Sequence, residues 1–269
     1  MGQWTSDFEN RVFTDPDRIT FPMTMGSGRY GAAARLSYVL GLRGPCLSID
    51  AACSSGLACV HLAVQSLRAG ECELALAGGA NLILQPHIHI AYSQSRMMAP
   101  DGRCKFGDAS GNGYVRSEGV GVVVLKSLEK AQRDGDHVYA VIRGSAVNND
   151  GRSSGSMGRP SRIGQIELLR QAYDDADVAP AAVGYVEAHG TGTRAGDPVE
   201  LGALSQVLGE GREPGRHAWV GSIKTNIGHT EATAGVAGLI KAALVLRNGA
   251  IPPSLHFNQP NPTIPWSDL

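Results

Sequence analysis

Three stretches of the chain repeat one pattern, in which a short apolar run leads through a tight loop into a helical segment. The three apolar runs are residues 46–49, 183–188 and 218–223. Repeated units of strand, loop and helix favour an α/β fold, whose layers of sheet and helix carry the functional site at the strand ends. No change of composition marks a linker along the chain, so we expect one large domain.

The spacing of apolar residues predicts further elements. Helices are expected at residues 32–40, 54–68, 163–176, 197–208 and 230–248, and further strands at 73–84, 119–126 and 137–147. We expect Gly78 and Gly79 to bend their strand. Asp197 is expected to cap the helix that Pro198 opens. Two segments rich in small and polar residues are expected to be irregular, namely 1–30 and 148–160.

Cys53 is the residue with catalytic chemistry in the first loop. We expect a buried strand at residues 46–49 before it and a helix from Ser54 onward. A thiol at such a turn meets the positive end of the helix dipole and unpaired backbone N–H groups, which favour the more nucleophilic thiolate. A buried structural thiol is the alternative. Two histidines in the other loops favour a nucleophile, and with it covalent thioester chemistry.

His189 and His229 lie in the second and third loops, among Gly and Thr rather than apolar residues. Neutral imidazoles there could stabilise an enolate or oxyanion, or move protons, whereas surface or capping histidines are the alternative. Because His229 begins a helix, its charged form should be disfavoured. Lys224 is either an exposed anchor or an electrostatic element that tunes the histidines, and Glu231 is its candidate ion-pair partner.

The composition excludes several classes of function. A net charge of −1 over 269 residues gives no basic surface for nucleic acid or anionic lipid. No apolar run is long enough to span a membrane. The five cysteines are odd in number and include no Cys-x-x-Cys pair, which indicates neither a disulfide framework nor a metal site. A reducing, cytoplasmic location fits best.

Two further patterns are expected to be structural. Residues 26–31 match G-x-G-x-x-G, but the segment before them is a poor strand that contains Pro22. A glycine turn is therefore favoured over a nucleotide site. Residues 101–118 hold a dense mixture of charges, where a hydrogen-bonded loop network is favoured over a pair of catalytic carboxylates.

Three longer motifs carry a resemblance to a known family. They are IDAACSS at residues 49–55, EAHGTGT at residues 187–193 and KTNIGHTEA at residues 224–232. In order and spacing they resemble the active-site motifs of β-ketoacyl synthases. Four other segments resemble the ketosynthase domains of type I polyketide synthases, namely residues 101–106, 113–119, 148–154 and 251–254.

The resemblance implies a thiolase-like fold of five α/β/α/β/α layers, built from two half-folds. One half-fold would carry Cys53 and end near residue 150, and the other would carry both histidines from about residue 160. The implied reaction is a decarboxylative Claisen condensation in polyketide or fatty acid biosynthesis, performed by a homodimer. Substrates would arrive on the phosphopantetheine of an acyl carrier protein, held by Thr191 and Thr193, and the chain itself would bind no cofactor.

The same resemblance assigns roles to the candidate site residues. Cys53 would take the acyl chain as a thioester, and its backbone N–H would form half of an oxyanion hole. His189 and His229 would assist decarboxylation of a malonyl-type thioester and stabilise the resulting enolate. Lys224 would support the two histidines, with Glu231 as a supporting residue.

The motifs also depart from the family pattern. Ala51 stands where Thr is frequent and Gly56 where Ser is usual, and both changes should preserve the chemistry. A complete member has more chain before Gly26 and continues past Leu269 into a loop with the second oxyanion donor. We therefore expect a partial domain, truncated at both ends, with open sheet edges. The alternatives are a non-catalytic remnant with a structural or dimerising role, and a cysteine hydrolase, which would leave the second histidine and Lys224 unexplained.

Overall fold

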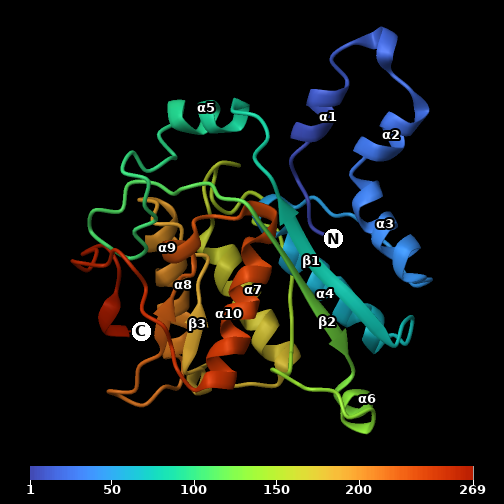
Figure 1. Cartoon of the computed structure of the whole chain (residues 1–269). Helices are drawn as coiled ribbons and strands as arrows, with labels where there is room; N and C mark the ends of the chain where they lie inside the picture. The colour runs from blue at the N-terminus through green and yellow to red at the C-terminus, as the bar shows by residue number, and fades with distance from the viewer. Residues whose placement is uncertain (269) are drawn as a thin grey trace. The chain divides into compact units, whose positions relative to one another are not determined.

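In the computed structural model, which describes residues 1–268, helices alternate with four short strands (Figure 1). Contacts within the chain define two units. The first unit comprises Met1–Ile90, Ser117–His137 and Thr230–Ala237. The second comprises Ala91–Arg116, Val138–His229 and the chain from Gly238 onward. Each unit is thus assembled from segments that lie far apart in the sequence.

The first unit contains helices, 3-10 turns and one pair of strands. Its helices and turns are α1 (Asp7–Val12), η1 (Pro16–Arg18), α2 (Phe21–Ser27), α3 (Tyr30–Leu40), η2 (Ala52–Ser54), α4 (Ser55–Arg68), α6 (Leu128–Arg133) and η4 (Glu231–Thr233). α3 and α4 confirm the predicted helices, and Gly41 ends α3 with a φ of +65°. The prediction that residues 1–30 are irregular is wrong, because α1 and α2 form there. Pro22 lies in the first turn of α2, where a missing N–H does not cost a hydrogen bond.

The segment with the G-x-G-x-x-G pattern joins α2 to α3. No strand precedes it in the described chain, so the glycine turn is confirmed over a nucleotide-binding fingerprint.

β1 (Leu74–Asn81) and β2 (Gly119–Lys126) pair antiparallel, and α4 packs against β1 (Figure 1). Both strands lie where the sequence predicts them. The expected bend at Gly78 and Gly79 is wrong, since both glycines sit in the unbroken ladder. A Cβ on Gly78 would lie 2.2 Å from the carbonyl oxygen of Gly121, so this glycine permits close approach of the two strands.

Residues 46–49 do not form the buried strand that the sequence predicts. They are extended but largely exposed, and Ile49 forms an isolated bridge with Gly2. The bridge consists of two hydrogen bonds, from the Ile49 N–H to the Met1 carbonyl at 2.9 Å and from the Gln3 N–H to the Ile49 carbonyl at 3.0 Å. A single bridged residue pair is too short to build a ladder, so the run remains extended without becoming a strand.

The second unit combines a parallel strand pair with several helices. Its elements are α7 (Arg162–Ala176), η3 (Pro180–Ala182), β3 (Tyr185–Glu187), α8 (Gly196–Gly209), β4 (Trp219–Gly221), α9 (Lys224–Ile227) and η5 (Trp266–Asp268). β3 and β4 are parallel, and α7 packs against α8 (Figure 1). The predicted helices at 163–176 and 197–208 and the strands at 183–188 and 218–223 are confirmed, with the strands shorter than expected.

A hydrophobic core fixes the ends of β3 and β4. Its buried members are Phe106, Ala188, Leu201, Leu204, Leu208, Ala218 and Ile264. Three of them are leucines at a helical spacing on α8, a helix that is buried on nearly all of its faces. Because Ala188 belongs to this core, the chain is anchored immediately before His189.

The prediction of a strand at residues 137–147 is wrong. These residues are irregular, with no strand among them in the part of the chain that the structure describes. α6 fills the connection after β2 instead. β-branched residues favour a strand only where a neighbouring strand can pair with them. The predicted irregular loop at 148–160 is confirmed.

The longest helices described are α7 and α10 (Ala234–Asn248), with 15 residues each. α10 follows η4 and therefore starts later than the predicted residue 230, and Gly249 ends it with a φ of +61°. A helix needs about 20 residues to span a bilayer. No helix within residues 1–268 is long and apolar enough to cross a membrane.

Candidate active site

The cysteine turn, residues 50–56, belongs to the first unit. Cys53 is the middle residue of η2, and α4 begins two residues later, as the sequence predicts. Ala52 has a φ of +50°, a left-handed conformation that costs a non-glycine residue on the order of 1–2 kcal/mol. The Cys53 side chain is half-buried. The turn therefore presents a partly accessible thiol beside a strained residue at the start of a helix.

Short side chains of the same turn hold it in place. The Ser55 hydroxyl accepts a hydrogen bond from the Ala51 N–H at 2.9 Å and donates one to the Ala52 carbonyl at 2.6 Å. The Asp50 carboxylate accepts from the Ala52 N–H at 3.2 Å. These bonds all join residues at most four apart, so the local sequence carries most of the information for this turn.

Two glycines let the chain near residue 232 approach the cysteine turn and β1. A Cβ on Gly56 would lie 2.8 Å from the Ala232 carbonyl oxygen, and one on Gly79 would lie 2.5 Å from the same atom. Real Cβ atoms do not approach backbone so closely. Gly56 and Gly79 are therefore steric requirements of this packing.

The histidine loop, residues 188–195, leads from β3 to α8 in the second unit. The Ala188 N–H donates to the Gly221 carbonyl at 2.8 Å and so continues the β3–β4 pairing. The next two N–H groups, of His189 and Gly190, donate to the Glu200 carboxylate at 2.6 and 2.8 Å. Burial is the largest influence on Glu200 and raises its pKa, which its bonds to these two N–H groups oppose. One side chain of α8 thus fixes the backbone of His189.

Asp197 holds the far side of the histidine loop, although not as the predicted helix cap. α8 begins at Gly196 with Ala195 as its N-cap, so Asp197 lies inside the first turn. Its buried carboxylate accepts from the N–H groups of Gly107 at 2.9 Å and Gly192 at 3.0 Å. Burial raises the pKa of Asp197 to about 6, although its hydrogen bonds with the backbone oppose the shift. The carboxylate is not at the capping position because these more distant N–H groups need an acceptor.

The backbone conformation and packing of the histidine loop require glycine at two positions. Gly190 and Gly192 have φ angles of +47° and +80°. A Cβ at Gly190 would lie 2.6 Å from the Cβ of Ser222, and one at Gly192 would lie 2.6 Å from the backbone nitrogen of Lys105. Both conformation and space therefore exclude larger residues.

The lysine segment, residues 222–229, follows β4 and lies against the histidine loop. Lys224 is buried, with 4% of its surface exposed, so the exposed-anchor alternative is wrong. Its ammonium donates to the His189 carbonyl at 2.5 Å. The Ser222 hydroxyl donates to the Gly190 carbonyl at 2.8 Å. Lys224 is therefore a buried charge hydrogen-bonded to the backbone of the histidine it was predicted to influence.

His229 closes the lysine segment and meets His189 ring to ring. It is 2% exposed, and its N–H donates to the Val115 carbonyl at 2.7 Å. Its ring centroid lies 5.3 Å from that of His189, with the two planes nearly perpendicular at 83°, and 5.2 Å from the ring of Tyr114. The structure thus brings together three predicted site residues, His189, His229 and Lys224.

Both imidazoles are held in the neutral form. Burial first, and then the charges of Lys224, His189 and Arg116, lower the pKa of His229 to about 2. Desolvation and then Lys224 also lower the pKa of His189, although part of its side chain remains open to solvent. The expected direction for His229 is confirmed, but burial and neighbouring charges cause it. Neutral imidazoles each offer one N–H donor at neutral pH.

Thr191 and Thr193 lie in the same loop. Their hydroxyl oxygens are 3.1 Å apart, and that of Thr193 also accepts from the Gly196 N–H at 3.1 Å. Thr191 is buried and Thr193 half-buried. Each hydroxyl can donate one hydrogen bond and accept two, so these contacts leave further hydrogen-bonding capacity.

Glu231 and Cys53 belong to the first unit, whereas the other predicted site residues belong to the second. Glu231 is 2% exposed and accepts a hydrogen bond from the Trp4 indole at 3.1 Å. Its φ of +46° makes it, after Ala52, a second strained residue within a candidate motif. Pairing of Glu231 with Lys224 stays a prediction.

The sequence reasoning missed the carboxylates that hold the histidine loop, Glu200 and Asp197, as well as Glu187 before it. A signal for two of them was present. Asp197 and Glu200 lie three residues apart at the start of a predicted helix, so they share one helix face. Acidic residues in a first turn also face the positive end of the helix dipole.

The charged stretch at residues 101–118 forms the predicted loop network, and its residues 101–116 belong to the second unit. Lys105 pairs with Asp101 at 2.6 Å, and the Asp108 carboxylate accepts from the N–H groups of Ser110, Asn258 and Gln259. Within residues 1–268, no group of three or more His, Cys, Asp or Glu side chains is arranged to hold a metal ion.

Comparisons with known proteins agree with this fold and these motifs. Residues 1–131 match the model of the beta-ketoacyl synthase N-terminal domain, and residues 139–258 match that of the C-terminal domain. A phenolphthiocerol/phthiocerol polyketide synthase of Mycobacterium tuberculosis is 54% identical over 268 residues, covering 100% of this chain. A partially reducing polyketide synthase of Menisporopsis theobromae is 49% identical over 99% of the chain.

A solved ketosynthase is also similar in structure. The ketosynthase from module 6 of the bacillaene synthase of Bacillus subtilis 168 superposes with a TM-score of 0.91 at 39% identity. The match covers 99% of this chain and 45% of that one. The fold is therefore thiolase-like, that of an acyl-transferring condensing enzyme.

The chain belongs to the beta-ketoacyl synthase family. Within it, its relatives are the ketosynthase domains of polyketide synthases. The chain spans only 14% of the length of the mycobacterial relative and 10% of the fungal one.

Proposed function

We propose that the chain condenses thioesters by decarboxylative Claisen chemistry, in polyketide or fatty acid biosynthesis. The observation that carries this proposal is the pair of neutral imidazoles of His189 and His229, 5.3 Å apart beside the buried Lys224. Two neutral N–H donors, one on the buried His229 and one on the solvent-accessible His189, can stabilise the negative charge of an enolate, because hydrogen bonds aimed at a developing charge are strong. Family membership supports the same reaction.

The proposed reaction has two half-reactions. In the first, the Cys53 thiolate attacks the carbonyl of an acyl thioester, forms a new thioester and releases the carrier thiol. In the second, a malonyl-type thioester loses CO2 as its C–C bond breaks, and the bonding electrons remain as an enolate that His189 and His229 stabilise. The enolate carbon then attacks the Cys53 thioester, which forms the new C–C bond and releases the thiolate.

The remaining residues would support these steps. The Cys53 N–H would be one oxyanion donor. Thr191 and Thr193 would bind the phosphopantetheine arm through their remaining hydrogen-bonding capacity. Lys224 would keep both imidazoles neutral, and Glu231 would support it.

We also propose the setting in which the reaction occurs. An acyl carrier protein would deliver the acyl and malonyl-type thioesters, so that the chain binds no cofactor of its own. The chain would consist of two half-folds, one carrying Cys53 and the other both histidines, and two copies of the chain would form a homodimer. It would work in the cytoplasm, where reduced cysteines persist.

Two measurements on the purified chain test the proposal. After incubation with an acyl-pantetheine thioester, intact mass should show one acyl adduct that Cys53→Ala loses. With malonyl-pantetheine thioester, CO2 release should fall in His229→Ala by about 10²–10³, as for loss of one oxyanion-type donor. The Cys53 adduct should still form in that variant.

Two results would contradict the proposal. Folded wild-type chain that forms no adduct and releases no CO2 would exclude both half-reactions. Hydrolysis of the acyl thioester without condensation would instead indicate a cysteine hydrolase.

A further inference from the structure

A buried ion pair lies directly before the histidine loop. The carboxylate of Glu187, the last residue of β3, pairs with the ammonium of Lys241 of α10 at 2.7 Å. Their side chains are only 7% and 8% exposed. Burying two charges costs several kcal/mol of desolvation for each ion, and a hydrophobic pair of similar size is often as stable. Stability alone therefore gives no reason for this pair.

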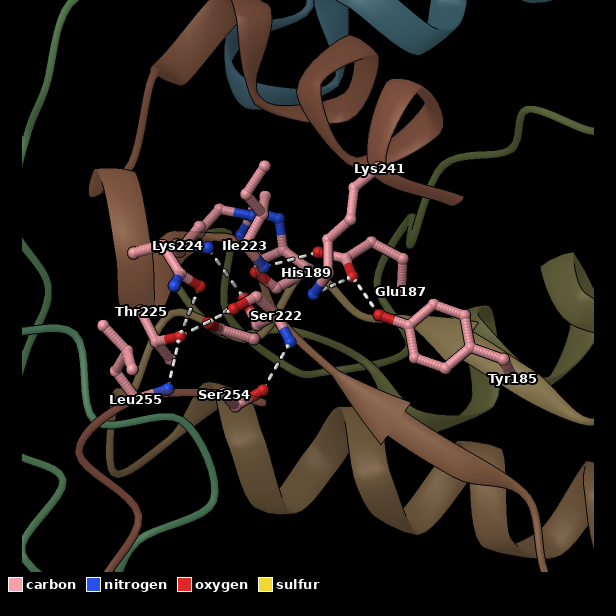
Figure 2. Close-up of polar contacts among 12 residues, drawn as sticks. Tyr185, Glu187, His189, Ser222, Ile223, Lys224, Thr225, Lys241, Ser254 and Leu255 are labelled. Atoms are coloured by element: carbon pink, nitrogen blue, oxygen red, sulfur yellow. Dashed lines mark hydrogen bonds and ion pairs between the residues drawn. The ribbon is translucent and has the colours of Figure 1, made fainter. Parts of the chain in front are cut away.

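The Glu187 carboxylate uses both oxygens (Figure 2). Oε2 faces Lys241 and also accepts a hydrogen bond from the hydroxyl of Tyr185, the first residue of β3. Oε1 accepts from the Ile223 N–H at 2.5 Å. The Lys241 ammonium also lies 5.7 Å from the centre of the Tyr185 ring, within range of a cation–π interaction. The four residues therefore form one buried polar cluster.

Glycines bring these groups together. A Cβ on Gly238 would lie 3.1 Å from the Glu187 Cγ, and one on Gly221 would lie 3.0 Å from the Tyr185 hydroxyl. Gly238 is three residues before Lys241, on the same face of α10. The close approach of α10 to β3 thus places Lys241 over Glu187.

The cluster ends at the two segments that carry Lys224 and His189. Ile223 immediately precedes Lys224, and Glu187 is two residues before His189. Lys224 in turn donates to the His189 carbonyl at 2.5 Å. Figure 2 shows these contacts as one connected path from Lys241 through Glu187 and Ile223 to Lys224 and His189.

We propose that the Glu187–Lys241 ion pair, with Tyr185, is a positioning device that sets Lys224 against His189 for the decarboxylation half-reaction. This inference rests on the proposed function. The three side chains reach the imidazoles through the Ile223 backbone, because the hydrogen bond from its N–H joins the cluster to the lysine segment.

The choice of charged residues has an electrostatic reason. The energy of two charges depends inversely on their distance, so a displaced Lys224 would act less strongly on the two imidazoles. A lone carboxylate at Glu187 would anchor Ile223 but would also favour imidazolium. Lys241 neutralises that carboxylate, so the pair holds the backbone without adding net charge beside the histidines.

Step-specific kinetics can separate positioning from stability. We would compare Lys241→Met, Tyr185→Phe and the double variant Glu187→Leu/Lys241→Met, which removes the acceptor for the Ile223 N–H, with wild type. Lys241→Arg is the conservative rescue. Val207→Ala is the matched control, because it opens the same unit's core at a fully buried position of α8 that is outside the cluster.

Two rates are measured on the folded fraction of each variant: Cys53 acylation by an acyl-pantetheine thioester, and CO2 release from malonyl-pantetheine thioester. Misplacement of a catalytic group by about 1 Å can cost about a hundredfold in rate. We expect Lys241→Met to slow decarboxylation by about ten- to a hundredfold with little change in acylation. Lys241→Arg should recover most of the loss, and Val207→Ala should leave both rates per folded molecule unchanged.

The histidine titration curves, followed by NMR, give a second readout. In Lys241→Met both imidazoles should protonate at higher pH than in wild type, and in Val207→Ala they should not. If Lys241→Met fails to fold, the double variant and Tyr185→Phe carry the test, since neither leaves a buried lone carboxylate.

Three outcomes would overturn the inference. In the first, acylation and decarboxylation slow by the same factor in the cluster variants. In the second, the double variant decarboxylates at the wild-type rate. In the third, Lys241→Arg folds but does not recover the decarboxylation rate that Lys241→Met loses. Wild-type chain without acylation and decarboxylation would instead contradict the proposed function itself.

Discussion

The cysteine turn and the histidine loop place their reactive side chains by different physical means. In the cysteine turn, the bonds that hold the backbone join residues at most four apart, such as Ser55 with Ala51 and Ala52, and a longer-range bond runs from Arg29 to the exposed Asp50 carboxylate. In the histidine loop, the anchors are buried carboxylates 5 to 90 residues away from the N–H groups they accept from, as for Asp197 with Gly192 and Gly107. Local polar contacts and tight packing shape one region, and distant buried charges shape the other.

The difference teaches what each region requires of its surroundings. A turn held by local bonds needs little from outside beyond steric fit, apart from the exposed ion pair of Asp50 with Arg29. A loop held by buried carboxylates depends on the helix that supplies them, because a buried N–H without an acceptor costs free energy. Substitutions that remove a charged side chain should therefore destabilise the histidine region, and substitutions that add volume should destabilise the cysteine region.

The largest expected effect tests the claim about volume. Gly79→Ala places a Cβ 2.5 Å from the Ala232 carbonyl oxygen and 3.1 Å from the Thr233 Cα, which are backbone atoms that cannot rotate away. We expect the free energy of unfolding to fall by about 3 kcal/mol, the upper range for overpacking. Urea unfolding measures it.

Gly44→Ala is the matched control in the same unit. Its Cβ would meet the Cβ of Cys72 at 3.6 Å, an ordinary contact, and Gly44 has no left-handed φ. Its effect should stay within about 0.5 kcal/mol. Equal losses in both variants would show that packing against residues 232–233 does not constrain β1 behind the cysteine turn.

The second expected effect tests the claim about charge. Glu200→Gln keeps the size of the side chain but replaces one acceptor oxygen with an NH2 group that faces a backbone donor, at either His189 or Gly190. One buried N–H then lacks an acceptor, and we expect a loss of about 2 kcal/mol in the free energy of unfolding. Urea unfolding of the variant beside wild type measures it.

Glu210→Gln makes the same substitution at the end of α8. Glu210 pairs with Arg170 at an exposed position, where ion pairs contribute about 0–1 kcal/mol. A loss at Glu210 as large as that at Glu200 would mean that the carboxylate contacts of the histidine loop add nothing specific.

The same contrast explains what the sequence could predict. Cys53 at a helix start, and the helices that follow it and His189, are local patterns, and the structure confirms them. The prediction of a buried strand at residues 46–49 is wrong, because a strand needs a partner along its length and Gly2 supplies a single bridge, at Ile49. Asp197 was wrongly expected to cap its own helix, because its actual partners include Gly107, which is distant in the sequence.

Lys241 illustrates what the sequence alone does not predict about the candidate site. It is the one charged residue in the apolar run from Ala234 to Leu246, and that pattern alone marks it as unusual. The pattern does not reveal that Glu187 lies against Lys241, because this contact joins β3 and α10, which are far apart in the sequence. Sequence reasoning therefore found the reactive residues but missed those that hold them.

The third effect concerns pH and is specific to the histidine region. The pKa of His229 is about 2 in the folded chain, against about 6.5 for an unperturbed histidine. Below pH 6.5 the unfolded chain binds a proton at this position and the folded chain does not, so stability falls as pH falls toward 2. The slope should approach about 1.4 kcal/mol per pH unit.

His229→Gln should lower the slope by that amount and leave the contribution of His189, whose pKa is also lowered, as urea unfolding between pH 7 and pH 4 measures. Asp197 acts oppositely, since its raised pKa makes the folded chain lose stability as pH rises between about 4 and 6. The comparison of variant with wild type cancels this contribution. An unchanged slope in His229→Gln would mean that His229 is not held neutral in the folded chain.

The smallest expected effect returns to the cysteine turn. Ser55→Ala removes two local hydrogen bonds, but Ala51 and Ala52 are exposed, so water can replace the lost partner. We expect the free energy of unfolding, measured in urea, to fall by about 1 kcal/mol in Ser55→Ala. It should fall by about 0.5 kcal/mol or less in Ser54→Ala, whose exposed hydroxyl makes one comparable bond to Ala51.

A loss at Ser55 that matches the loss at Glu200 would remove the contrast between the regions, since local contacts would then be as costly to break as buried charges. A small loss at Ser55 together with slower alkylation of Cys53 would sharpen it, because the turn would then use its serine to orient the thiol rather than to stabilise the fold.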